Sequence, residues 1–376
     1  MNTARAWAWV AHLRTGGTTP WQEFAPGDPD SAASSADALL PGAIQLEVVR
    51  RLNLAADPAG TADPRHRALV DRVLAASAPG RGQPDLPLVG VLDDTRFGPP
   101  PADPAALPDD ELLRMTVGVL AELALDLDPG PEPEQRSPLP VPWRRKWAVV
   151  GDPLIADRTR SDLVAAGRRP GLRSPVALVV ADDLAAMLAD TWTWRVRHRV
   201  TPSWAWWVGH WARRDQLPPR VDLAAVAARW AGRVGRERVH VLVGGELPAS
   251  LLGTAVDLRA DPLSADAGEL LRRVNEVLRV LVRPERHQRL LDRVVVPLLA
   301  GERGTLPGVP EAQQEWVRRR ADRLVGELSR AGYPVHGELA SLRPRNGCGP
   351  TAAGATGALD VALRALLATR TIEEAR

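Results

Sequence analysis

Three short apolar runs in the second half of the chain constrain its fold more than any other feature. They cover residues 147–150, 176–180 and 239–243, they are rich in β-branched side chains, and segments with helical periodicity separate them. Strands buried on both faces read as continuous apolar runs, and intervening helices supply the crossovers of a parallel sheet. The sequence therefore predicts an α/β domain, with three layers and a parallel sheet, over residues 141–345.

Proline-rich stretches and a glycine-rich segment predict the domain limits. GPPPADPAALPDD (98–110) and DPGPEPEQRSPLPVP (128–142) place a linker near residue 140, since proline fixes φ and removes a hydrogen-bond donor. We expect a mostly helical N-terminal domain over residues 1–140. After NGCGPTAAGATG (346–357), residues 346–376 are expected to form a flexible tail with a short helix.

Composition excludes several function classes. The 48 basic and 46 acidic residues leave a net charge of +2, too small to indicate a nucleic-acid partner. The single cysteine, Cys348, cannot form an internal disulfide. No segment approaches the ~18 apolar residues of a membrane span, and the N-terminus lacks the pattern of a signal peptide. We therefore expect a cytoplasmic protein without a membrane span.

Two pairs of segments indicate an internal repeat. EVVRRLN (47–53) matches ELLRRVN (269–275), and RHRALVDRV (65–73) matches RHQRLLDRV (286–294). Charged, His and Asn positions agree in order and spacing. The N-terminal domain is therefore interpreted as a partial repeat of the C-terminal half, and the alternative is convergence of amphipathic Arg/Leu helices.

Four segments, covering about half the chain with the loops between them, carry a family resemblance. They read VALVVADDLAAMLADTW (176–192), DLAAVAARWAGRVGRERVHVLV (222–243), ELLRRVNEVL (269–278) and WVRRRADRLVGELSRAGYPVHGELASLRP (316–344). Together they resemble the bacterial P-loop sulfotransferase-like family. The resemblance implies a loop of pattern GxPKTGTT after the first strand, whose amides and lysine hold the sulfate-bearing phosphate of phosphoadenosine phosphosulfate.

The equivalent loop in this chain, GDPLIADR, departs from that pattern. The resemblance implies a degenerate cofactor site, because leucine stands at the lysine position and two carboxylates are added. The loop residues concerned are Gly151, Asp152, Pro153, Leu154, Asp157 and Arg158.

The second cofactor-binding element also differs from the family pattern by a gain of negative charge. Asp182 and Asp190 align with the arginine and the serine that hold the 3'-phosphate in the family. Carboxylates would repel a phosphate at both positions. We therefore expect binding of phosphoadenosine phosphosulfate to be lost, with no cofactor and no metal.

Catalytic residues are left unassigned, with His198, His210 and Asp183 as candidates. Imidazole titrates near neutral pH, and both histidines flank a tryptophan-rich segment. Asp183 follows a predicted strand, where the alternative role is to cap the next helix.

Four tryptophans at helical spacing form the remaining candidate site. They are Trp204, Trp206, Trp207 and Trp211. One reading is a helix packed by large rings. The other readings are a surface for a glycan or a protein partner, with at least one indole exposed, beside a run of arginines at 195, 197 and 199.

The leading hypothesis is a non-catalytic sulfotransferase-like protein that acts as a binding or assembly module, linked to glycan or polysaccharide modification. The alternative is an active transferase, either a sulfotransferase or a nucleotide-dependent enzyme, that uses the remodelled cleft. In that case converging carboxylates could bind a divalent cation; they are Asp152, Asp157, Asp182 and Asp190. A purely structural protein is the third reading.

Overall fold

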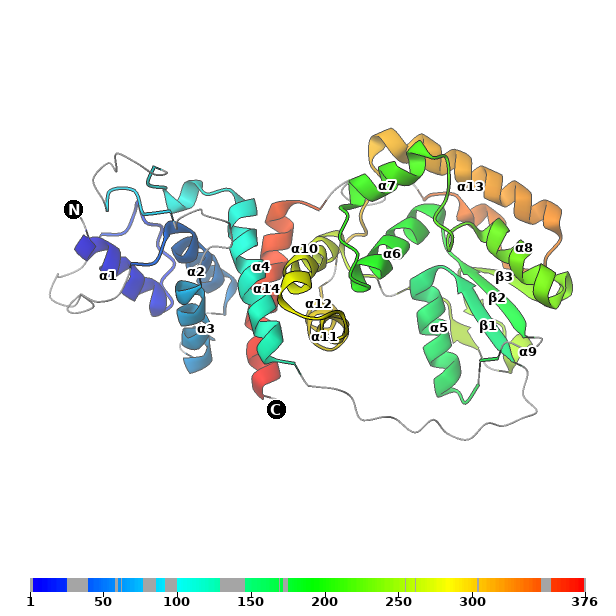
Figure 1. Cartoon of the computed structure of the whole chain (residues 1–376), viewed down its shortest axis with the longest axis horizontal. Coiled ribbons are helices and arrows are strands. Elements are labelled where there is room, and N and C mark those ends of the chain that lie inside the picture. Colours follow the sequence, from blue (N-terminus) through cyan, green and yellow to red (C-terminus); the bar gives the residue numbers. More distant parts are fainter. Residues whose placement is uncertain are drawn as a thin grey trace. The chain divides into compact units, whose positions relative to one another are not determined.

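The computed structural model divides the chain into two compact units, each assembled from separate stretches of sequence (Figure 1). A helical unit comprises Met1–Gly130, Glu269–Glu302 and Gly354–Arg376, and an α/β unit comprises Pro131–Gly268 and Arg303–Ala353. The residues described are 3–25, 40–57, 60–61, 63–76, 86–91, 100–128, 146–168, 170–171, 175–253, 255–260, 262–302, 304–345 and 353–374.

This division differs from the predicted limits at residues 140 and 345. Residues 269–302, which we placed in the α/β domain, belong to the helical unit. The physical reason is that amphipathic helices in this stretch bury their apolar faces among other helices and not on the sheet. The predicted linker near residue 140 lies outside the described residues.

A four-stranded parallel sheet organises the α/β unit. The strands are β1 (Trp147–Gly151), β2 (Val176–Ala181), β3 (Val239–Val243) and β6 (Val335–Gly337), in the order β1-β2-β3-β6. The register places Val149 opposite Leu178, and Leu178 opposite His240. The three predicted strands and their parallel pairing are therefore confirmed.

Helices cover both faces of this sheet. On one face, Trp147, Val149, Leu178 and Leu242 form a buried cluster with side chains of α5 (Pro153–Ala165). The alternate residues face α8 (Leu223–Val234), which packs against β1, β2 and β3. The other elements of this unit are α6 (Leu184–Arg197), α7 (Trp204–Arg213), β4 (Glu246–Leu247), α9 (Ala249–Leu252), β5 (Val256–Asp257) and α13 (Glu311–Ala331).

The helical unit brings together segments from both ends of the sequence. Its helices are α1 (Thr3–Arg14), α2 (Ala43–Ala55), α3 (Pro64–Ala75), α4 (Asp109–Asp126), α10 (Ala265–Leu281, which begins in the α/β unit), α11 (Pro284–Leu290), α12 (Val296–Leu299) and α14 (Ala355–Glu374). Within the described residues, no helix is both long and apolar enough to cross a membrane.

Residues 355–374, predicted as part of a flexible tail with a short helix, form one packed helix of 20 residues. These residues form α14, which packs along α4 and α2 (Figure 1). Leu359, Leu363 and Leu366 are buried, because spacings of three and four residues place them on one helical face. The glycine-rich composition before this helix indicated flexibility, but the apolar stripe determined the packing.

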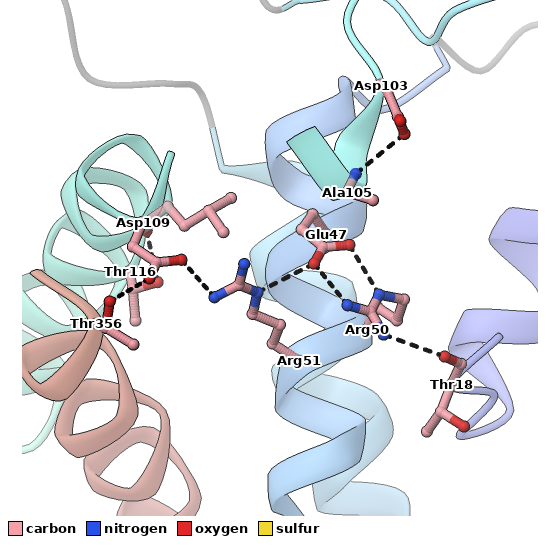
Figure 2. Close-up of polar contacts among 10 residues, drawn as sticks. Thr18, Glu47, Arg50, Arg51, Asp103, Ala105, Asp109, Thr116 and Thr356 are labelled. Carbon is pink, nitrogen blue, oxygen red and sulfur yellow. Dashed lines mark hydrogen bonds and ion pairs between the residues drawn. The ribbon is translucent and has the colours of Figure 1, made fainter. Parts of the chain in front are cut away.

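Matching Glu–Arg contacts appear in the two segments of the proposed repeat. In α2, the Glu47 carboxylate accepts hydrogen bonds from Arg50 at 2.7 Å and from Arg51 at 3.0 Å (Figure 2). In α10, Glu269 accepts from Arg272 at 2.7 Å and from Arg273 at 2.9 Å. The contacts therefore agree at each matching position.

A buried Asn–His pair is also present in both segments. Asn53 Oδ1 lies 2.8 Å from His66 Nε2, and Asn275 Oδ1 lies 2.8 Å from His287 Nε2. All four side chains are buried. Helices that had merely converged on an Arg/Leu pattern would not require the same buried polar pair, so this contact supports the repeat as our interpretation.

The N-terminus of α4 binds one arginine from each of the two matching segments. Asp109 Oδ1 lies 2.6 Å from Arg51, and Thr356 of α14 also donates to Asp109 (Figure 2). Asp110 Oδ1 lies 2.7 Å from Arg273. Carboxylates in the first turn of a helix also interact favourably with its dipole. The first turn of α4 therefore contacts both α2 and α10.

Removing either asparagine should destabilise the helical unit to a similar degree. Asn53→Ala and Asn275→Ala each leave a buried imidazole nitrogen without its partner, at a cost of about 1–3 kcal/mol. Urea denaturation followed by circular dichroism measures the change. The exposed Arg279→Ala on α10 is the control and should stay within about 0.5 kcal/mol of wild type. A large effect at only one asparagine would contradict equivalent roles.

Candidate functional site

A carboxylate of the chain itself accepts the hydrogen bonds of the backbone amides in the loop after β1. Asp152 is the N-cap of α5, and its Oδ1 accepts hydrogen bonds from the amides of Leu154 at 3.0 Å and Ile155 at 3.1 Å. Gly151 makes the turn possible with φ of 104°, and a Cβ at this position would lie 2.2 Å from the carbonyl oxygen of Val180. The loop amides that could receive an anion are therefore already occupied.

Leucine stands at the lysine position of the loop, and the arginine of the loop lies beside a carboxylate of α5. The Leu154 side chain is buried in the unit, since only 6% of it is exposed. Arg158 is exposed on α5, and its Nε lies 3.9 Å from Asp162 Oδ2. Asp157 faces two other partners, because it accepts from Trp194 Nε1 at 2.8 Å and pairs with Arg160.

Asp190 of α6 meets Asp152 below this loop. Both side chains are buried, and their carboxyl groups lie within hydrogen-bonding reach of each other. Within the described residues, Asp152 Oδ2 and Asp190 Oδ1 have no donor when both groups are ionised. A single proton held between the two groups would satisfy both oxygens.

Asp182 and Asp183 lie at the end of β2, with Arg345 beside them. Asp183 caps α6 by accepting from the amide of Ala186 at 3.0 Å, and burial raises the pKa of its carboxyl. Arg345 Nη2 lies 2.6 Å from Asp182 Oδ1. The structure therefore favours the capping role that the sequence left open for Asp183.

The four acidic residues do not converge on one point. The carboxyl groups of Asp152 and Asp190 lie next to each other, and the charge of Asp182 repels both at longer range. Asp157 instead accepts a hydrogen bond from Trp194. Across the described ranges, no group of three or more His, Cys, Asp or Glu side chains is arranged to hold a metal ion.

Neither candidate histidine contacts a carboxylate in the described part of the chain. His198 Nδ1 lies 2.7 Å from the carbonyl oxygen of Trp194, and the two rings stack with centroids 3.9 Å apart. His210 stacks on Trp206, and desolvation together with the neighbouring Arg214 lowers the pKa of its imidazole. Their acid–base roles stay predictions without a paired group in support.

The tryptophans of α7 divide between packing and exposure. Trp204 and Trp207 are buried, and Trp204 Nε1 donates to the carbonyl oxygen of Gly308 at 2.7 Å. Trp211 is half-buried. Trp206 is 54% exposed, so one ring remains accessible to a partner, as expected.

A pocket at the end of β1 escaped the sequence analysis. It has a volume of about 220 Å³ and is lined by Gly151, Arg160, Arg220, Arg229 and Trp230, among others. The arginines come from α5, from the turn after Pro218–Pro219, and from α8. The signal present in the sequence was this Pro-Pro-Arg turn before a helix that carries Arg229 and Trp230.

Comparison with known proteins returned no match: no family model, no curated protein and no solved structure resembles the chain significantly.

The buried carboxyl pair should make stability fall as pH rises. Burial raises the pKa of Asp152 to about 7 and that of Asp190 well above its usual value, with Asp182 adding repulsion and Arg197 opposing it. These folded-state pKa values exceed the ~3.9 of an aspartate in the unfolded chain. The contribution of the pair to the unfolding free energy is therefore complete below about pH 4 and is lost as pH rises through about 7.

Asp190→Asn tests this, because its amide donates to Asp152 without needing a proton. Between pH 5 and pH 8, wild type should lose about 1–3 kcal/mol more unfolding free energy than the variant, measured by urea denaturation. The control Asp162→Asn, on the exposed face of α5, should keep the wild-type dependence. Identical pH profiles for wild type and Asp190→Asn would show that the pair holds no proton.

Proposed function

We propose that this chain is a non-catalytic sulfotransferase-like module that binds or assembles partners. The observation that carries the proposal is the contact of Asp152 Oδ1 with the amides of Leu154 and Ile155. In the family that the sequence resembles, amides at this helix N-terminus receive a cofactor phosphate. Here an internal carboxylate fills the same role, so α5 is capped without a ligand.

Electrostatics around the loop supports the same proposal. Asp190 and Asp182 stand at the two positions that the resemblance assigns to the 3'-phosphate, and Asp190 is buried against Asp152. Two like charges 4 Å apart repel by about 4 kcal/mol at the effective dielectric typical of such sites. Asp182 is paired with Arg345, so the repulsion that a 3'-phosphate would meet comes from the ionised form of the buried Asp152–Asp190 pair.

The link to glycan or polysaccharide modification rests on the resemblance alone. The exposed ring of Trp206, stacked on His210 with centroids 5.1 Å apart, is the tryptophan of α7 that a partner or sugar could reach. Trp204 and Trp207 are buried in the packing of α7. Within α7, the proposal of a partner-binding surface therefore rests on the exposed ring of Trp206.

Titration calorimetry with phosphoadenosine phosphosulfate tests the proposal. We expect a dissociation constant above about 1 mM, equivalent to less than ~4 kcal/mol, because no loop amide and no loop lysine is free to bind the phosphate. Low salt is the stringent condition, since screening is weakest there. Micromolar binding would overturn the proposal and favour the active transferase.

A variant series locates the cause. Leu154→Lys, Asp182→Arg and Asp190→Ser, combined with Asp152→Ser to uncharge the cap, should bring the dissociation constant below that of wild type by at least about tenfold, or 1.4 kcal/mol. Circular dichroism confirms that each variant is folded. Asp162→Asn, which removes a charge on the exposed face of α5, is the matched control and should not gain binding.

A further inference from the structure

Two adjoining pockets form a groove with an excess of guanidinium groups in the α/β unit. The first, of about 220 Å³, holds Arg160 and Arg220; the second, of about 320 Å³, holds Arg320. Both are lined by Pro219 and Arg229, so they meet at these residues. We call this feature the arginine groove.

The positive charge of the arginine groove is only partly balanced. Asp157 pairs with Arg160, and Asp222 is engaged as the N-cap of α8, where it accepts from the amide of Ala225 at 3.1 Å. Arg229 is exposed and makes no hydrogen bond or ion pair with any part of the chain that the structure describes. The groove therefore has cations in excess of its own carboxylates.

Two further guanidinium groups of the groove form no ion pair within the described residues. Arg220 lies over Trp194, with its guanidinium carbon 4.1 Å from the ring centroid, and burial lowers its pKa, while the charge of Asp157 opposes this shift. Arg320 Nε is buried and has no acceptor within the described residues. An incoming anion would gain charge-assisted hydrogen bonds that the free protein lacks.

Carboxylate–guanidinium pairs already form in and beside this groove. The chain's own Asp157 already binds Arg160, and Asp215 pairs with Arg323 on the neighbouring α13, so carboxylate–guanidinium geometry recurs in this region. The first pocket has one half-buried indole, Trp230, and a nucleic acid would need several rings for its bases.

We propose that the arginine groove binds an acidic peptide of a partner protein, with glutamate or aspartate side chains entering the two pockets on either side of Arg229. This inference rests on the proposed function, because it names the partner class of the binding module. Guanidinium forks bind carboxylates with two parallel hydrogen bonds, which fixes the orientation of the peptide as well as its affinity.

Fluorescence anisotropy with a labelled hexaglutamate peptide tests the proposal on the full chain. We expect saturable binding that weakens when salt rises from 50 to 300 mM, since ion pairs at an open groove are screened. Arg229→Ala should lower the affinity about tenfold, and Arg229→Glu should abolish binding. The exposed Arg236→Ala, outside both pockets, is the matched control and should change the affinity less than twofold.

Four outcomes would overturn the acidic-peptide site. They are no binding by hexaglutamate, an equal loss in Arg229→Ala and Arg236→Ala, tighter binding of a single-stranded oligonucleotide, and binding of citrate without binding of the peptide. Phosphoadenosine phosphosulfate is titrated into the same preparation. Its micromolar binding would refute the proposed function, whereas weak binding of both ligands would refute the acidic-peptide site alone.

Discussion

A carboxylate buried at the start of α5 is the constraint on which the α/β unit depends. Asp152 satisfies two helix amides, and this requires a glycine before it, a proline after it, and a neighbour that tolerates a buried acid. Burial raises the pKa of both Asp152 and Asp190, which favours a neutral carboxyl group in this pair. A capping aspartate is normally partly solvated and worth about 1 kcal/mol; burial adds a cost that protonation of the pair would limit.

The same arrangement separates the charges of this unit. Acidic groups gather under the loop and at the end of β2, where Arg345 neutralises part of their charge. Arginines gather on the other side of β1, where Gly151 lines the pocket without a side chain. This end of the sheet therefore has buried carboxyl groups under the loop and an open groove lined by arginines.

Local patterns in the sequence predicted the strands but not the partners of the helices. The runs at 147–150, 176–180 and 239–243 were recognisable because β-branched residues fill a strand buried on both faces. Strand β6 has three residues, one of them His336, and left no comparable run. An amphipathic helix shows which face it buries and not against what, so α10 and α14 were assigned to the wrong regions. The meeting of Asp152 with Asp190 is a tertiary contact between two helices, and no spacing along the chain encodes it.

The two units alternate along the sequence, so they are completed at different times during translation. The α/β unit ends at Ala353, so all its strands exist before α14 has left the ribosome. The helical unit needs Ala355–Glu374 to cover α4, whose Leu113 and Leu120 are fully buried in the finished protein. Helix α4 therefore waits through more than half of translation with an apolar surface uncovered, a period in which a chaperone or a partner would have access to it.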